Sequence, residues 1–147
     1  MSNITLPIKK LDPNAVLPKY NKEGDAGLDL VVNSINHTEL YIEYGTGLAF
    51  EIPRGYVGLI FQRSSVTNKP VGFDLKNAVG VIDSTYRGEV TGRFNYPSNM
   101  ENIKDIYNVG DKFLQMVIVP IPYCEVKEVS ELSESERGLN GYGSSGN

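Results

Sequence analysis

The chain has 147 residues, a normal length for one domain with its own hydrophobic core, and we expect a single domain. Its 18 acidic and 14 basic residues give a net charge of −4. This acidic balance argues against a general nucleic-acid binder or a membrane-surface binder. An anionic ligand must therefore be met by local cations or a metal ion, because the overall field opposes it.

The predicted strands follow one another along most of the chain. Short segments rich in β-branched and aromatic residues recur between Gly, Pro and Asn, and no long stretch has the 3.6-residue apolar period of a helix. The one weak helical candidate is 99–106. Many short strands predict an all-β sandwich, jelly roll or barrel. In chain order, we expect strands at 28–32, 47–53, 56–62, 79–83, 89–95, 112–120 and 124–129.

Cysteine usage and the N-terminus bear on the compartment. The single Cys124 cannot form an internal disulfide, and with the lone His37 it cannot complete a zinc site. Cys124 stands at the end of an apolar run, where we expect a buried thiol. No stretch resembles a signal peptide or approaches the roughly 20 apolar residues that span a bilayer. We therefore expect a cytoplasmic, reducing compartment.

The C-terminal segment differs in composition from the rest of the chain. It is rich in Glu and then in Gly, and it cannot bury enough apolar surface to fold alone. We expect a β-rich core at 1–129 and a mobile arm at 130–147. Composition alone favours a solvated tail. The order Arg137, Tyr142 and two serines (144–145) favours an arm that binds a ligand.

The stretch FQRSSV (61–66) carries a candidate phosphate site at the end of a predicted strand. Arg63 is followed by the hydroxyls of Ser64 and Ser65, and charge-assisted contacts from a guanidinium suit phosphate oxygens. The alternative is a surface arginine followed by a serine turn, and this stretch alone does not decide between the two.

The stretch FDLKNAVGVIDSTYRGEV (73–90) carries a candidate catalytic carboxylate. Asp83 ends a predicted strand and suits a general base or an anchor for a metal-bound water. Tyr86 offers a flat face to a sugar or a base. The alternative is structural: Asp83 caps a turn and Tyr86 fills the core.

Two weaker signals complete the set of polar residues. Asp25 and Asp29 flank a glycine, which also fits a turn followed by a strand. Gln115 interrupts an apolar strand, so its amide needs a hydrogen-bond partner or a ligand. The sequence has no Walker loop, GxGxxG fingerprint or Ser-His-Asp set, so phosphate chemistry here requires another scaffold.

Together these stretches resemble the trimeric dUTPases, a family with five motifs in fixed order. The resemblance spans nearly the whole chain, and GVIDxxYRGE with a terminal RGxxGYGSSG is its most specific part. The five stretches are AGLDL (26–30), RSS (63–65), NAVGVIDSTYRGE (77–89), GDKFLQ (110–115) and RGLNGYGSSG (137–146).

The resemblance implies a jelly-roll-like (β-clip) subunit in a homotrimer, with active sites at the subunit interfaces. It implies hydrolysis of dUTP to dUMP and diphosphate with Mg²⁺, which removes dUTP and supplies dUMP for dTMP synthesis. Asp83 would deprotonate the water that attacks the α-phosphorus, and Tyr86 would pack under the deoxyribose. The uracil edge would be read by Asn77 and the backbone of Gly80, Val81 and Ile82.

The resemblance also implies which residues hold the phosphates. Arg63, Ser64, Ser65 and Gln115 would do so in the core. In the arm, Tyr142 would stack on the uracil, and the γ-phosphate would be gripped by Arg137, Gly143, Ser144 and Ser145. Mg²⁺ would be held by phosphates and waters without direct protein ligands. Asp29 would support the Arg63 region or a metal-bound water.

Several positions depart from the family pattern. Gln62 replaces a common Pro, Tyr142 a usual Phe, and Lys112 a frequent Arg. The stretch 96–108 is longer than usual and is a candidate surface for a regulatory protein partner. Two alternatives stay open: a dCTP deaminase of related fold, and a regulatory binding protein that closes around a nucleotide as a switch.

Overall fold

The computed structural model of the chain describes residues 3–99 and 106–141. Within these ranges the protein is all-β, with a single short 3₁₀ helix, η1 (Ser64–Asn68), so the predicted fold class is confirmed at this level. The strands are β1 (Ile8–Lys10), β2 (Leu28–Val31), β3 (Ser34–His37), β4 (Ile42–Phe50), β5 (Tyr56–Gln62), β6 (Gly80–Ile82), β7 (Glu89–Phe94) and β8 (Lys112–Pro120). None of the helices in the described ranges has the length and apolar character to cross a membrane.

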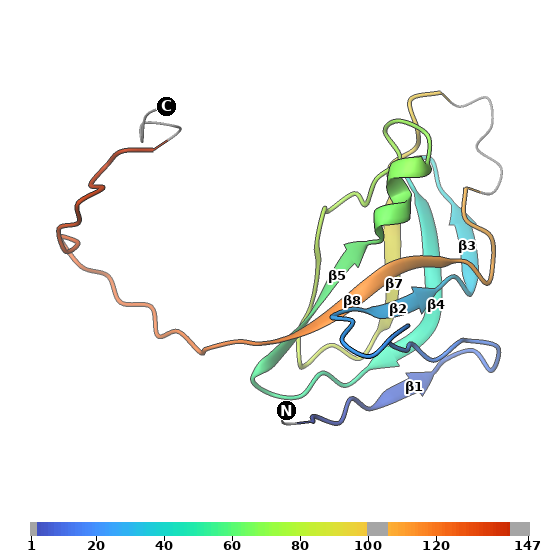
Figure 1. Cartoon of the computed structure of the whole chain (residues 1–147), viewed down its shortest axis with the longest axis horizontal. Coiled ribbons are helices and arrows are strands. Elements are labelled where there is room, and N and C mark those ends of the chain that lie inside the picture. The colour runs from blue at the N-terminus through green and yellow to red at the C-terminus, as the bar shows by residue number, and fades with distance from the viewer. Residues whose placement is uncertain (1–2, 100–105, 142–147) are drawn as a thin grey trace.

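The strands form two antiparallel sheets (Figure 1). In the first sheet the long strand β4 pairs with β7 on one side and with β1 and β3, end to end, on the other. The second sheet has the order β2-β8-β5-β6. Because β6 ends this order and pairs only with β5 among the described strands, one of its edges stays open. This open edge belongs to the candidate site.

The two sheets share one hydrophobic core. Leu30 of β2 and Leu114 of β8 are fully buried in the same cluster as Ile42 of β4 and Phe94 of β7. An aromatic cluster occupies one part of this core, with Phe73 stacked on Phe94 at a centroid distance of 4.8 Å. Aromatic pairs of this kind stabilise a fold by about 0.5–1.5 kcal/mol each beyond the area that they bury. The core fixes the sheets from which the site residues project.

Predicted strands with clear apolar alternation match the structure. Strands β5 and β8 have the predicted bounds, 56–62 and 112–120, and β2, β6 and β7 differ by one or two residues. The prediction at 47–53 catches only the end of β4. Strands β1 and β3 were not predicted, because their short sequences, IKK and SINH, are polar and take their pairing from β4.

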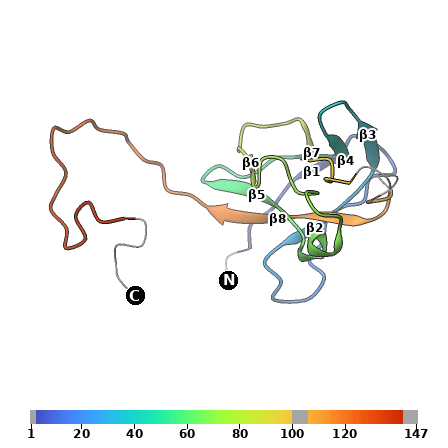
Figure 2. The same ribbon diagram turned by 90° about the horizontal axis from the view of Figure 1, so that it is seen from above.

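The predicted strand at 124–129 is wrong for the single chain. Residues 121–141 contain no helix or strand, and all of them except Gly141 are exposed. Both views show this segment running away from the sheets (Figure 1, Figure 2). Cys124 is therefore exposed and not buried as predicted, because the apolar run leaves the body of the protein after β8 ends at Pro120.

The longer stretch 96–108 is only partly described, since residues 100–105, most of the weak helical candidate, lie outside the described ranges. Tyr96 donates a hydrogen bond from its hydroxyl to the carbonyl of Thr38. Ile106 and Tyr107 are buried in the core cluster. The described ends of this stretch therefore belong to the fold.

Candidate active site

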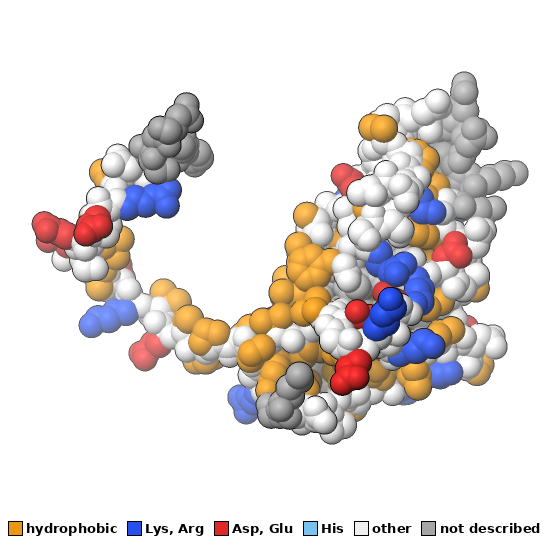
Figure 3. Space-filling model, viewed as in Figure 1, with side chains coloured by type: hydrophobic (Ala, Val, Ile, Leu, Met, Phe, Trp, Pro, Cys, Tyr) orange, Lys and Arg blue, Asp and Glu red, His pale blue; other side chains and the backbone are white. Residues whose placement is uncertain are grey.

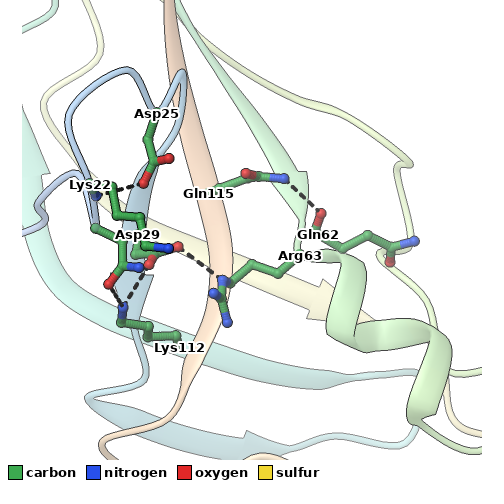
Figure 4. A network of polar contacts seen from close by, with 8 residues as sticks. Lys22, Asp25, Asp29, Gln62, Arg63, Lys112 and Gln115 are labelled. Atoms are coloured by element: carbon green, nitrogen blue, oxygen red, sulfur yellow. Dashed lines mark hydrogen bonds and ion pairs between the residues drawn. The ribbon is translucent and has the colours of Figure 1, made fainter.

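Arg63 stands directly after β5, where the chain turns into η1. Its Nε donates to Asp29 Oδ1 at 2.9 Å, and the other carboxylate oxygen of Asp29 accepts from Lys112 Nζ at 2.8 Å (Figure 4). Asp29 is 8 % exposed. A buried carboxylate is tolerated when it is paired and hydrogen-bonded in this way. Two cations on one carboxylate leave one net positive charge, which suits a phosphate.

Gln115 lies between Asp29 and Phe61 in the second sheet, where the register sets it opposite both. Its Nε2 donates to the carbonyl of Gln62 at 3.4 Å, so the amide has the partner that the sequence required. Gly27 leaves room for this side chain, since an added Cβ would lie 2.8 Å from Gln115 Oε1. The glycine of the AGLDL stretch thus permits a close approach of the backbone to Gln115.

A shallow pocket of about 580 Å³ opens beside these residues. Arg63, Ser65, Lys69 and Lys112 are among the side chains that line it. Figure 3 shows basic side chains gathered over β2 and β8 on one face of the body. The pocket therefore combines cations and a hydroxyl, and we call it the phosphate pocket.

The backbone of β6 presents its open edge at the other end of the second sheet. Gly80 lies opposite Ile60, and a Cβ added to Gly80 would come within 3.0 Å of Ile60 Cβ. Val81 is 62 % exposed. Unpaired N–H and C=O groups on an edge strand are free to pair with another molecule.

A strained turn precedes β6. Ala78 has a φ of 59°, and it is the only described non-glycine residue with a positive φ. The N–H of Val79 donates to the carbonyl of Asn77 at 2.6 Å, which closes a three-residue γ-turn around Ala78. Backbone strain of this kind costs about 1–3 kcal/mol and often accompanies function. The turn leaves the side chain of Asn77 exposed at the start of the candidate base-reading segment.

Asp83 follows β6 and begins a tight turn in which the N–H of Tyr86 donates to its carbonyl at 3.1 Å. The Asp83 carboxylate is exposed, and it has no hydrogen bond or ion pair among the described residues. Tyr86 is 44 % exposed and donates from its hydroxyl to the carbonyl of Glu89 at 3.0 Å. Its ring is therefore not part of the core, which removes the structural alternative for Tyr86.

Arg87 and Glu89, whose roles the sequence did not reveal, hold this turn in place. Arg87 Nη1 donates to the carbonyls of Ser84 and Tyr86 at 2.8 and 2.9 Å. Glu89 Oε1 accepts from the N–H of Gly47 at 2.7 Å and so ties the turn to β4. An Arg-Gly-Glu run carries no sequence signal for such local backbone contacts.

The two halves of the candidate site lie at opposite ends of β5. The register sets Ile82 opposite Gly58, whereas Arg63 follows the last residue of β5. The five residues from Gly58 to Arg63 span about 17 Å at roughly 3.3 Å per residue. Asp83 and Arg63 of one chain therefore do not meet around one phosphate group.

Of the arm residues predicted to bind the substrate, Arg137 alone lies in the described ranges, and it contacts neither half. Arg137 is exposed, and its Nε donates to the carbonyl of Asn140 at 2.9 Å within the same segment. Tyr142, Gly143, Ser144 and Ser145 lie outside the described residues.

Comparisons with known proteins identify the family. The family model for dUTPase matches residues 13–146. A deoxyuridine 5'-triphosphate nucleotidohydrolase of Nautilia profundicola is 40% identical over 147 residues, covering 96% of this chain and 98% of the relative. That of Corynebacterium glutamicum is 37% identical over 147 residues, covering 96% and 94%.

Solved structures agree with this family. The dUTPase of Staphylococcus bacteriophage 80alpha with dUPNHPP has a TM-score of 0.81 at 31% identity and covers 99% of this chain and 100% of that one. A mutant dUTPase from phage phi11 of S. aureus, in a structure that concerns a structural Mg(II) ion, has a TM-score of 0.71 at 29% identity, covering 87% and 98%. The five motifs, the fold and the match over nearly the whole length agree, and the chain belongs to the dUTPase family.

Proposed function

We propose that the chain hydrolyses dUTP to dUMP and diphosphate, and that Asp83 activates the water that attacks the α-phosphate. The observation that carries this proposal is the unpaired, exposed Asp83 carboxylate beside the open edge of β6. An exposed carboxylate without a cation on it is free to accept a proton from water. The identity of the substrate and the roles of the other site residues are inferred from the family.

The base and the sugar would be bound by the segment that leads to Asp83. The exposed side chain of Asn77 and the open edge of Gly80, Val81 and Ile82 supply amide and backbone groups to the uracil edge. The exposed ring of Tyr86 supplies a flat surface for the deoxyribose. A close fit around the base would exclude the methyl group of thymine.

The phosphates would be bound by Arg63 and Ser65 in the phosphate pocket, and by Ser64 and Gln115, which are not among the residues that line it. Asp29 keeps the Arg63 guanidinium in a fixed orientation through a 2.9 Å contact. Its second oxygen is bound to Lys112, so Asp29 acts through Arg63 and not as a free metal ligand.

The protein would work as a homotrimer with the sites at the subunit interfaces. The separation of Asp83 from Arg63 along β5 supports this arrangement, because a cyclic oligomer brings one end of a subunit to the other end of its neighbour. Residues Tyr123 and Val126 also fit a subunit contact, because both are apolar and exposed. They lie in the segment 121–141, which pairs with no strand of its own chain among the described residues.

The arm would close over the bound nucleotide. Tyr142 would stack on the uracil, and the γ-phosphate would be bound by Arg137, Gly143, Ser144 and Ser145. The extended course of the described arm residues supports this role, because it leaves the arm free to reach another subunit (Figure 1). Closure of such a segment excludes water and completes a site.

Magnesium would enter with the substrate. Mg²⁺ takes oxygen ligands and is often bound through substrate phosphates and waters, and the cationic side chains of the phosphate pocket suit the phosphates that would carry it. When bound, Mg²⁺ would neutralise phosphate charge, while Arg63 orients the phosphate chain and Asp83 takes the proton from water.

A nucleotide panel tests the proposed activity. Diphosphate release from dUTP, UTP, dTTP and dCTP is measured with Mg²⁺ and, in parallel, with EDTA. We expect release from dUTP with dUMP as the product, strong suppression by EDTA, and rates more than about tenfold lower with the other nucleotides. Ammonia from dCTP without diphosphate from dUTP would replace the proposal with a deaminase.

A second role, as a nucleotide-dependent regulatory partner, is favoured by the likeness to the phage 80alpha protein. That structure belongs to work described as phage dUTPases controlling transfer of virulence genes by a G protein-like mechanism. Capture of one host protein by this chain with dUpNHpp, and not without nucleotide, would support the role. Equal capture in both conditions would contradict it.

A further inference from the structure

Tyr107 has a buried hydroxyl that the fold leaves without a partner. The residue is 2 % exposed, and its ring packs against Tyr44 and Phe113 in the aromatic cluster. Among the buried side-chain oxygens and nitrogens of the described ranges, its Oη is the one with no hydrogen bond. An unpaired buried hydroxyl destabilises a fold and calls for an explanation.

Tyr107 borders the phosphate pocket although its side chain is almost fully buried. Tyr107 lines this pocket together with Arg63 and Ser65. Lys69 holds the neighbouring backbone, because its Nζ donates to the carbonyl of Ile106 at 2.7 Å and sits 4.5 Å from the centre of the Tyr107 ring. These contacts hold the Tyr107 ring in place at the pocket whose other side chains would bind phosphate.

Ser65 and Arg63 line the same pocket as Tyr107 and are the two groups that favour ionisation of its hydroxyl. Burial raises the pKa of Tyr107 above its ordinary value, while the Ser65 hydroxyl and then the Arg63 guanidinium act in the opposite direction. Both groups must lie close to Oη to have this effect, although Ser65 does not meet the geometry of a hydrogen bond in the free chain.

We propose that Tyr107 is a positioning residue for phosphate binding, whose hydroxyl donates a hydrogen bond to Ser65 Oγ when the Ser65 hydroxyl turns to donate to a phosphate oxygen. Tyr107 then supplies the donor, Ser65 accepts it and keeps its own proton for the phosphate. Because the buried hydroxyl is paired only in the bound state, its pairing adds to affinity. This inference rests on the proposed function, since it requires the pocket to take the phosphates of the substrate.

A double-mutant cycle with Tyr107→Phe and Ser65→Ala tests the proposal. We expect Tyr107→Phe to raise KM for dUTP about tenfold with kcat nearly unchanged, the pattern of lost binding that is equal in ground and transition states. Its Tm should not fall, because the variant removes an unpaired group. In the Ser65→Ala background, Tyr107→Phe should have no further effect, because the two residues act as one unit. An equal loss in both backgrounds overturns the proposal.

Tyr96→Phe is the matched control. Its hydroxyl donates to the carbonyl of Thr38, away from the phosphate pocket, so its loss should lower Tm and leave KM unchanged. A Tyr107→Phe variant that behaves like Tyr96→Phe, with lower Tm and wild-type KM, would reduce Tyr107 to a packing residue and contradict the inference.

Binding of inorganic pyrophosphate separates this inference from the proposed function. Weaker pyrophosphate binding in Tyr107→Phe supports the inference even if the wild-type protein fails to hydrolyse dUTP, in which case only the proposed function is lost. Wild-type hydrolysis of dUTP together with unchanged KM and pyrophosphate affinity in Tyr107→Phe overturns the inference alone.

Discussion

Asp83 differs from the other carboxylates of the site in having no partner among the described residues. Asp29 is bound by Arg63 and Lys112, and Glu89 accepts from the backbone of Gly47. The carboxylates of Asp29 and Glu89 stabilise the fold through these contacts. The carboxylate of Asp83 is unpaired, and it lies on a turn that Arg87 holds in place. The difference makes Asp83 the residue on which turnover should depend.

Replacing Asp83 with Asn should lower kcat for dUTP by about 10²–10⁴-fold, the usual loss when a positioned base is removed. Binding of dUpNHpp should change little, because the side chain keeps its size. Steady-state kinetics and calorimetric titration measure the two effects. Asp12→Asn is the control and should keep wild-type kcat, because the half-buried Asp12 accepts from the N–H of Asn14 and lines neither the phosphate pocket nor the turn of Asp83. A wild-type kcat in Asp83→Asn would exclude it as the base.

Tyr107 should also affect the stability of the protein at alkaline pH. Its pKa is raised from the ordinary value of 10.0, chiefly by burial. Below pH 10 both the folded and the unfolded states keep the proton, so the group makes no pH-dependent contribution. Above pH 10 the unfolded state releases the proton first, and the free energy of unfolding falls as pH rises.

The free energy of unfolding of the wild type should therefore drop relative to Tyr107→Phe above pH 10. Urea denaturation of both proteins at about pH 8 and about pH 11 measures this difference, and the other tyrosines cancel in the comparison. A gap between the two proteins that stays constant across this range would show that the Tyr107 hydroxyl is not buried in solution.

At the scale of elements, pairing with a neighbouring strand determines which segments become strands where the sequence alone is ambiguous. Strands β5 and β8 could be predicted to the residue, because their β-branched and apolar runs form the middle of the second sheet. Strand β3 is polar and exists because it pairs with β4. The segment 124–129 has strand-like residues but no partner within one chain. The β-propensity of a segment predicts a strand, but the segment forms one only where another strand is present to pair with it.

Candidate residues for the site could be named from the sequence, but their layout in space could not. The motifs identified Arg63 and Asp83 through a family resemblance. Their placement at opposite ends of β5 depends on the register of β5 with β6, which no motif encodes. Tyr107 belongs to the stretch 96–108, for which the sequence suggested a surface for a protein partner, whereas its ring lies in the core.

Removal of the arm should affect turnover and leave the fold intact. Arg137 contacts only its own segment among the described residues, so deletion after Glu136 should leave Tm unchanged. Stacking of a base on an aromatic ring contributes about 1–3 kcal/mol. We therefore expect kcat/KM for dUTP to fall by at least about tenfold in the deletion.

Tyr142→Phe is the control for this experiment, because it keeps the stacking ring, and it should retain nearly full activity. An unchanged kcat/KM in the deletion variant would remove the arm from the mechanism. A lowered Tm would instead assign it to the stability of the assembled protein.

On the scale of the whole molecule, each chain carries two half-sites that it cannot join by itself. The phosphate pocket with Arg63 and the turn with Asp83 are about 17 Å apart along β5 at roughly 3.3 Å per residue. In the proposed homotrimer, symmetry would place the first half of one subunit against the second half of the next. Each active site would then depend on residues from different chains.

This arrangement can be tested by mixing two inactive variants. Arg63→Ala lacks the phosphate half, and Asp83→Asn lacks the base. In a mixed oligomer, a site that takes Arg63 from an Asp83→Asn subunit and Asp83 from an Arg63→Ala subunit is complete. With random mixing in equal amounts, one half times one half gives about one quarter of the sites intact.

The most direct measurement is therefore the rate of diphosphate release from dUTP by co-expressed Arg63→Ala and Asp83→Asn subunits, purified as mixed oligomers through two different tags. The account predicts that each variant alone is nearly inactive and that the purified mixed trimers, freed of both parent trimers, recover about one third of wild-type activity, because each has one complete site in three. Mixed oligomers as inactive as the two parents would contradict it, because Arg63 and Asp83 would then have to act within one chain.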